Sequence, residues 1–161
     1  MSELAFIADQ LKRLHQGDAW HGPSVREAID GVTASLAGTR VVPHAHTIFA
    51  LTHHIAAWAD EVRQRLAGRA PQAPDAGDFP AREGPVSDAE WATARRRLDE
   101  THAALEAAIL AFDARRLDAP VGDQRDAPLG TGVTYRAMLH GLVQHDAYHA
   151  GQLVLLRRAL G

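Results

Sequence analysis

The sequence predicts an all-α protein built as a four-helix bundle. Four long segments place apolar residues at steps of three and four, the spacing that gives a helix one buried face. Alanine, leucine and arginine, which favour helices, dominate these segments, and no segment alternates apolar and polar residues as a half-buried strand would. At 161 residues the chain has the length of one domain, so we expect a single bundle over residues 1–161.

The first predicted helix begins after Ser2, whose hydroxyl can cap it, and ends near Gly17. Its buried face consists of Leu4, Ile7, Leu11 and Leu14. The connection that follows contains a short helical turn at residues 25–29. Residues 31–43 then form an irregular link, in which we expect one more turn.

The second predicted helix begins near His46 and Thr47 and continues to about Leu66, with Gly68 after its end. Its apolar stripe contains Ile48, Leu51, Ile55, Trp58, Val62 and Leu66. Residues 69–85 are rich in proline, glycine, alanine and aspartate and have no periodicity. This composition indicates a long surface loop rather than a boundary between domains.

A capping-box pattern, Ser-Asp-Ala-Glu from Ser87, predicts the start of a third helix that continues to about Arg116. Its buried stripe consists of Trp91, Leu98, Leu105, Ile109 and Phe112. Residues 117–132, with two prolines and three glycines, form a second loop. Thr134 then caps a fourth helix over residues 135–160, and we expect no strand anywhere in the chain.

The composition excludes several classes of protein. A formal net charge of −3 provides no basic face for nucleic acid, and no window is long and apolar enough to span a membrane. The N-terminal residues lack the basic and apolar regions of a secretion signal, so we expect a cytoplasmic protein. Because cysteine is absent, any metal ion must be bound by histidine, aspartate or glutamate.

His145 and His149 are the most informative pair among the ten histidines. Residues four apart lie one above the other on a helix, so both rings can point at one ion. The pair occupies positions on the fourth predicted helix where the spacing otherwise places leucine, between Leu142 and Leu156. Two buried imidazoles fit either a metal site or a structural hydrogen-bond network, and the pair alone does not separate these readings.

A third histidine favours the metal site. His54 lies near the centre of the apolar stripe of the second predicted helix, whereas His53 lies about 100° away, so we expect His54 to complete the set. Three histidines from two helices leave a metal ion with open positions, as in catalytic sites. Each ligating ring also needs an acceptor for its second nitrogen. Gln152 and Tyr148 are candidates, although packing or solvent contact would also explain them.

The remaining histidines have plainer explanations. His140 is five residues before His145 and is turned off the ligand face, so we expect it at the rim of the bundle. His102 has charged neighbours in the sequence, and we expect it to be exposed. Spacing identifies no partner for His15. Asp146 adjoins a candidate ligand but points about 100° away from it, so it is not a convincing general base.

Two parts of the sequence resemble the DinB-like (DinB/YfiT) superfamily, and the likeness extends over essentially the whole chain. They are Ala45-His46-Thr47-Ile48-Phe49 with the following His54-Ile55-Ala56-Ala57-Trp58, and His145-Asp146-Ala147-Tyr148-His149-Ala150-Gly151-Gln152. The resemblance implies a four-helix bundle with a divalent metal ion bound by three histidines. Matched position by position, it gives the ligands as His54, His145 and His149.

The resemblance also implies nickel or zinc as the ion and a homodimer as the assembly. Some relatives resemble thiol transferases that use low-molecular-weight thiols such as bacillithiol or mycothiol, and others resemble metal-dependent hydrolases or isomerases. We therefore expect a metal-dependent thiol S-transferase or hydrolase that acts on a small molecule. In either reaction the ion would acidify a bound thiol or water. The alternative is a non-enzymatic bundle that binds a metal ion or a small ligand.

Overall fold

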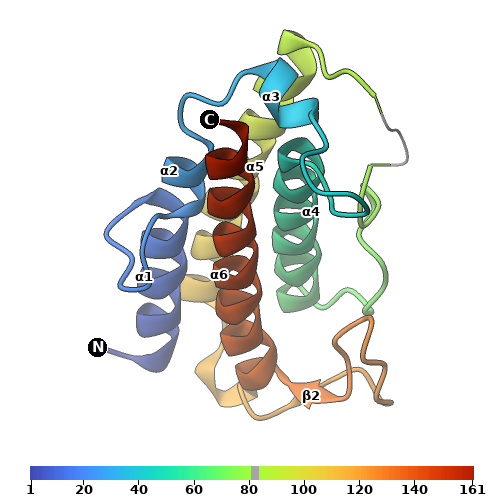
Figure 1. The fold of residues 1–161 in the computed structure, drawn as a ribbon. Coiled ribbons are helices and arrows are strands. Elements are labelled where there is room, and N and C mark those ends of the chain that lie inside the picture. Colours follow the sequence, from blue (N-terminus) through green and yellow to red (C-terminus); the bar gives the residue numbers. More distant parts are fainter. Residues whose placement is uncertain (81–83) are drawn as a thin grey trace.

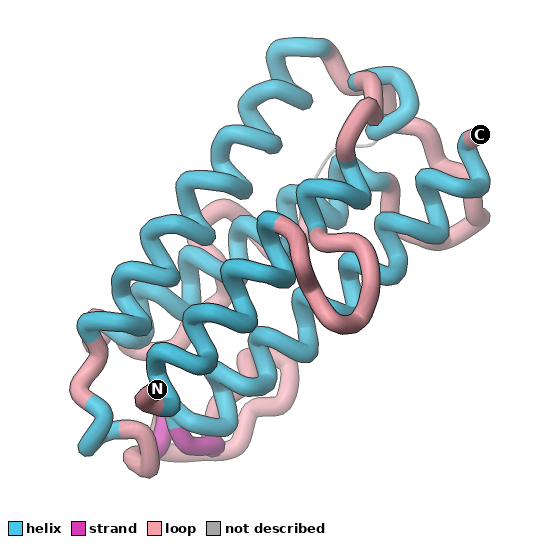
Figure 2. Tube along the Cα trace, turned by 90° about the vertical axis from the view of Figure 1, so that its left-hand side faces the viewer, coloured by secondary structure: helices cyan, strands magenta, loops and turns pink. Residues whose placement is uncertain are grey.

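The computed structural model describes residues 1–80 and 84–161, and this part of the chain is mostly helical, as predicted. Its α-helices are α1 (Glu3–Gln16), α2 (Val25–Ile29), α3 (Ala34–Gly38), α4 (Ile48–Leu66), α5 (Asp88–Ala111) and α6 (Tyr135–Leu160). The long helices α1, α4, α5 and α6 run alongside one another (Figure 1). Both α5 and α6 pack against α1 and α4, so the four helices enclose a common interior (Figure 2).

Side-chain caps fix the starts of the long helices where the sequence predicted them. The hydroxyls that accept a hydrogen bond from the backbone three residues on belong to Ser2, Thr47, Ser87 and Thr134. At Ser87 the backbone N–H also donates to Glu90, which completes the capping box. Each cap satisfies a donor that the first helical turn leaves without a partner, which contributes about 1 kcal/mol.

The structure departs from the sequence prediction after α5. This helix ends at Ala111, whereas the predicted helix continued to Arg116. Phe112 adopts an extended conformation with φ −70° and ψ 141°. The Asp113 carboxylate then accepts a hydrogen bond from the backbone of Arg115 and begins the 3₁₀-helix η1 (Ala114–Arg116). The carboxylate thus offers the backbone a hydrogen bond that competes with continuation of the helix. A prediction from apolar spacing takes no account of such a bond.

Two short strands were also not predicted. β1 (Pro120–Val121) pairs with β2 (Val133–Thr134) in antiparallel orientation, with Pro120 opposite Thr134 and Val121 opposite Val133. Each strand is two residues long, so no alternating pattern can appear in the sequence. The pair closes the connection between η1 and α6 and leads directly into the first turn of α6.

The buried apolar residues form two clusters that follow one another along the helices. One cluster lies among α1, α4, α5 and the N-terminal half of α6 and includes Val62 and Leu142. The other joins α2 and α3 to the C-terminal half of α6 and includes Leu51 and Leu153. Because α4 passes from the second cluster to the first and α6 from the first to the second, the two helices are antiparallel. Residues midway along each therefore lie at the same depth.

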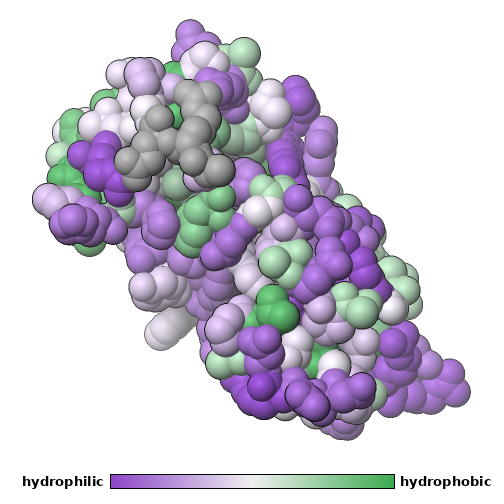
Figure 3. Space-filling view, turned by 90° about the vertical axis from the view of Figure 1, so that its right-hand side faces the viewer, coloured by the Kyte–Doolittle hydropathy of each residue, from purple (hydrophilic) through white to green (hydrophobic). Residues whose placement is uncertain are grey.

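The outer surface is mixed in polarity. The face in Figure 3 is covered mainly by hydrophilic residues, with apolar ones scattered between them, which is ordinary for a protein surface. None of the helices in the described part of the chain is both long and apolar enough to cross a membrane.

Core packing by α5 gives a first prediction. Leu105 is 1% exposed and Leu110, five residues later on the same helix, is 55% exposed. We expect Leu105→Ala to lower the free energy of unfolding by about 2–5 kcal/mol, because it leaves a cavity in the first cluster. The matched variant Leu110→Ala should change it by less than about 0.5 kcal/mol. Urea denaturation measures both, and equal effects would contradict the packing described.

Candidate metal centre

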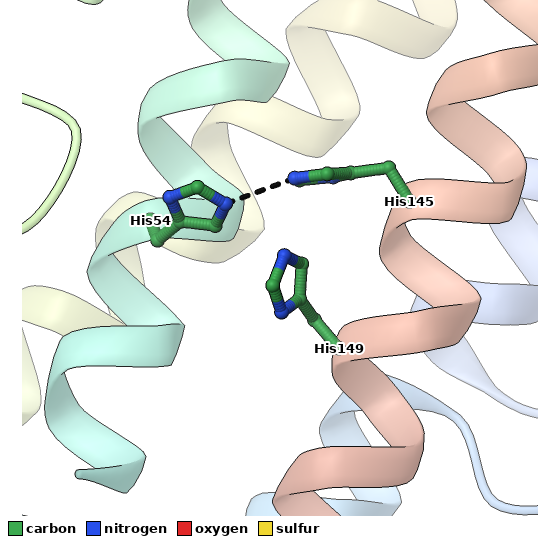
Figure 4. A group of neighbouring side chains, drawn as sticks. All are labelled: His54, His145 and His149. Atoms are coloured by element: carbon green, nitrogen blue, oxygen red, sulfur yellow. Dashed lines mark hydrogen bonds between the residues drawn. The ribbon is translucent and has the colours of Figure 1, made fainter. Parts of the chain in front are cut away.

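Three histidines converge between α4 and α6. His54 comes from α4, and His145 and His149 come from consecutive turns of α6 (Figure 4). One nitrogen from each ring lies within 4.8 Å of the other two, and the Nε2 atoms of His54 and His145 are 2.9 Å apart. His54 and His149 are buried and His145 is half-buried. His53 lies outside this group, because its Nε2 contacts the carbonyl oxygen of Ala76 at 3.1 Å.

The Nδ1 atom of every ring in this group faces an oxygen acceptor. The distances are 2.9 Å from His54 to Asp78 Oδ1, 2.9 Å from His145 to Asp146 Oδ1 and 2.6 Å from His149 to Gln152 Oε1. Carboxylate and amide oxygens accept but do not donate, so each Nδ1 carries the ring hydrogen. Each Nε2 then presents a lone pair, and in Figure 4 the outer nitrogens of the three rings face one another.

The surroundings also lower the pKa values of two of these rings, His54 and His149. Burial lowers the pKa of His54, and the adjacent His145 lowers it further against the opposing effect of Asp78. Burial lowers the pKa of His149 to about 4, although its hydrogen bond with Gln152 acts in the opposite direction. His54 and His149 are therefore neutral at neutral pH, which is the form that binds metal ions.

Converging lone pairs repel one another unless a cation lies among them. Nitrogens bound tetrahedrally to Zn²⁺ at about 2.0–2.1 Å lie roughly 3.3 Å apart, close to the 2.9 Å between His54 and His145. Imidazole nitrogens suit zinc, nickel, copper and iron. The residues present thus fit a divalent transition-metal ion, and the cluster could hold one.

Sequence reasoning missed two of the three supporting acceptors, Asp78 and Asp146. The helical angle placed Asp146 about 100° away from its neighbour, yet its Oδ1 is 2.9 Å from Nδ1 of His145. Asp78 lies in the loop between α4 and α5, where no periodicity indicates a role, yet it contacts His54 and accepts a hydrogen bond from Trp58 Nε1 at 2.7 Å. Gln152 was one of two candidates and contacts His149 directly. Tyr148, the other candidate, is 65% exposed. Only the conformation of the loop brings Asp78 to the site, so no sequence signal was available for it.

A second difference from expectation concerns His102, which the sequence suggested is exposed. The ring is buried between α5 and α6, with Nε2 at 3.0 Å from Asp146 Oδ2 and Nδ1 at 2.9 Å from the carbonyl oxygen of Leu98. Burial alone would raise the pKa of Asp146, but hydrogen bonds from His102 and His145 outweigh it and lower this pKa to about 2. Charged neighbours in the sequence were misleading, because they occupy other faces of α5.

A cavity of about 550 Å³ opens beside the three histidines. Its walls are mainly apolar, and the side chains from the helices and the loop after α4 include Trp58, Val62, Phe79, Met138 and Leu142. Residues 127–130 close one side. The buried Arg65 holds them in place, since its Nη1 donates to the carbonyl oxygen of Leu129 at 2.7 Å. A ligand of the ion could therefore extend into a largely apolar chamber.

Comparison with known protein families gave a match over most of the chain. The family model of the DinB superfamily matches residues 19–153, which include all three histidines. No curated protein and no solved structure matches the chain.

The buried His15 gives a prediction for the pH dependence of stability. Burial and the stacked ring of His102, 4.2 Å away, lower the pKa of His15 to about 4 despite the opposing effect of Asp99. A histidine in an unfolded chain has a pKa of about 6.5. Between these values the unfolded chain binds a proton that the folded protein does not, so the free energy of unfolding falls as the pH decreases.

We therefore expect the urea midpoint of the metal-free protein to decrease between about pH 7 and pH 5. The decrease should be smaller in His15→Gln, because the amide does not titrate and can still donate to Asp99. His54 and His149, whose pKa values are also lowered, contribute equally to both proteins. The same slope in wild type and variant would contradict the assignment.

Proposed function

The chain belongs to the DinB superfamily, and from that premise we propose that it binds one divalent metal ion through the Nε2 atoms of His54, His145 and His149. One observation carries the proposal. All three rings direct Nδ1 to an oxygen acceptor and present Nε2 to a common point. A structural hydrogen-bond network would need a donor inside the cluster, and with the hydrogen of each ring on Nδ1 the 2.9 Å contact between Nε2 of His54 and Nε2 of His145 has none.

We propose zinc or nickel as the ion. Both bind imidazole well, and the chain has no cysteine that would select softer ligation. Three neutral ligands leave the full charge of the ion uncompensated and at least one coordination position open. The cavity beside the histidines gives a small molecule access to that position.

The reaction that the site supports best is thiol S-transfer to a small electrophile. A bound ion of this kind supplies the acidity that converts a thiol to a thiolate near neutral pH. The sulfur forms a bond to the electrophilic carbon, the leaving group departs with its electron pair, and the thiol proton passes to solvent. The three histidines would hold the ion that binds the sulfur, and the apolar walls would exclude water that competes with it.

Hydrolysis is less well supported by the carboxylates beside the cluster. A metal-dependent hydrolase gains from a carboxylate that accepts a proton from the attacking water. Asp78 already contacts His54 and Trp58, and Asp146 contacts His145 and His102. To act as the base, either carboxylate would have to break a hydrogen bond that orients a histidine of the cluster. Thiol transfer requires no such base.

Metal binding is tested by removing one proposed ligand. We expect the purified protein to bind about one equivalent of zinc or nickel, and His149→Ala to weaken binding at least 100-fold because two imidazoles remain. His140→Ala is the matched control, since His140 is on the same helix but contacts Glu3 at 3.3 Å. Competition with a chromophoric chelator measures both affinities. Absence of uptake by the wild type, or equal losses in the two variants, would refute the proposal.

Ligand binding in the cavity gives a separate prediction. Gly141 lies in the cavity wall, and a Cβ atom built there meets nothing within 4 Å. We expect Gly141→Leu to keep metal affinity but to reduce the rate of conjugation between a low-molecular-weight thiol and an electrophile at least tenfold. Gly151→Leu, on the same helix but outside the cavity wall, should match the wild type.

The same assay separates an enzyme from a non-enzymatic binder. A panel of thiols and electrophiles is incubated with the metal-loaded wild type and both glycine variants. Turnover lost only in Gly141→Leu supports transfer in the cavity. Thiol binding without turnover would make the protein a binder, and equal turnover in all three proteins would place the reaction elsewhere.

A further inference from the structure

Asp146 is the only fully buried carboxylate among the described residues that contact the histidine cluster, and both of its oxygens are engaged. Its residue exposure is 0%. Oδ1 is 2.9 Å from Nδ1 of His145, and Oδ2 is 3.0 Å from Nε2 of His102. A buried carboxylate is stable only when its oxygens have donors, so the position of Asp146 depends on His102 as well as on His145.

The ring of His102 is itself held on three sides. Its Nδ1 is 2.9 Å from the carbonyl oxygen of Leu98 on the preceding turn of α5. One face stacks on His15 from α1, with ring centroids 4.2 Å apart and an interplanar angle of 8°. The ring is 6% exposed. Its Nε2 is thereby fixed in direction toward Asp146, across the interior from α5 to α6.

The hydrogen-bond acceptors of the other two rings come from other parts of the fold. His54 is oriented by Asp78, a loop residue with a side-chain exposure of 55%, and His149 by Gln152 from its own helix. The support of His145 is the one that reaches through the core to another helix. A change on α5, whose described residues do not line the cavity, therefore has a direct structural route to one of the three rings.

We propose that His102 is a positioning residue for His145, an inference that rests on the proposed metal site. By bonding Oδ2, His102 holds the Asp146 carboxylate in the one orientation that presents Oδ1 to Nδ1 of His145. That contact keeps the hydrogen of His145 on Nδ1 and its Nε2 directed at His54 and His149. Without His102, the carboxylate turns toward other donors or water, and His145 loses both its fixed tautomer and its ring orientation.

Two amide variants separate the roles of the two nitrogens of His102. Gln places an N–H group near the position of Nε2, so His102→Gln keeps a donor for Asp146. Asn places one near Nδ1, so His102→Asn can still contact the carbonyl oxygen of Leu98 but has no donor for Asp146. Acceptors that orient a metal-bound histidine typically contribute about 10–100-fold to metal affinity. We expect His102→Asn to lose about that much for zinc and His102→Gln to stay within about fivefold of wild type.

A third variant controls for packing, and a second readout reports on the ring itself. His15→Phe keeps the stacking on His102 but has no polar atom, so zinc affinity should stay within about threefold of wild type. Ring ¹⁵N shifts of the metal-free protein report which nitrogen of His145 carries hydrogen. We expect Nδ1–H in the wild type and in His102→Gln, and a mixture of tautomers in His102→Asn. A purely structural role for His102 would leave this signature unchanged.

The outcomes separate this inference from the proposed function. If the wild type takes up no zinc, the metal site itself is wrong. If the wild type binds zinc and His102→Asn matches it in affinity and tautomer, the positioning role is overturned. Equal losses in His102→Asn, His102→Gln and His15→Phe would also overturn it, since packing would then account for the effect. Should His102→Asn fail to fold, His102→Phe, which retains the stacked ring, replaces it under the same expectations.

Discussion

The site depends on one constraint: each of three neighbouring imidazoles must keep its hydrogen on Nδ1 so that its Nε2 is free to face the others. A histidine ring has two nitrogens, and whichever one meets a fixed acceptor decides where the hydrogen lies. Asp78, Asp146 and Gln152 supply these acceptors. The result is an arrangement of lone pairs that is unfavourable by itself and favourable around a cation.

The three acceptors that satisfy this constraint come from three different parts of the fold. The antiparallel arrangement of α4 and α6 brings the rings to the same depth, at the junction of the two apolar clusters. A loop supplies Asp78, the interior between the helices supplies Asp146 through its contact with α5, and α6 itself supplies Gln152. The loop residue is exposed, so solvent reaches this side of the site, whereas Asp146 lies in the interior.

Apolar spacing and capping residues were enough to predict the helical class, the starts of the long helices and the histidines that come together. His54, His145 and His149 stood out because each occupies a position on a stripe otherwise filled by apolar residues. The acceptors were harder to find, since Asp78 depends on the path of a loop without periodicity. The Asp146–His102 contact depends on how α5 and α6 face each other. The early end of α5 and the two-residue strands reflect local hydrogen bonds that hydrophobic patterns do not encode.

Diffraction from crystals grown with zinc or nickel, recorded at the absorption edge of the metal, tests the central claim most directly. The account predicts one anomalous peak per chain, at about 2.0–2.2 Å from the Nε2 atoms of His54, His145 and His149. The remaining coordination positions of the metal ion should face the cavity lined by Trp58 and Leu142. A peak bound through Nδ1, a peak at other residues, or no peak at saturating metal would contradict it.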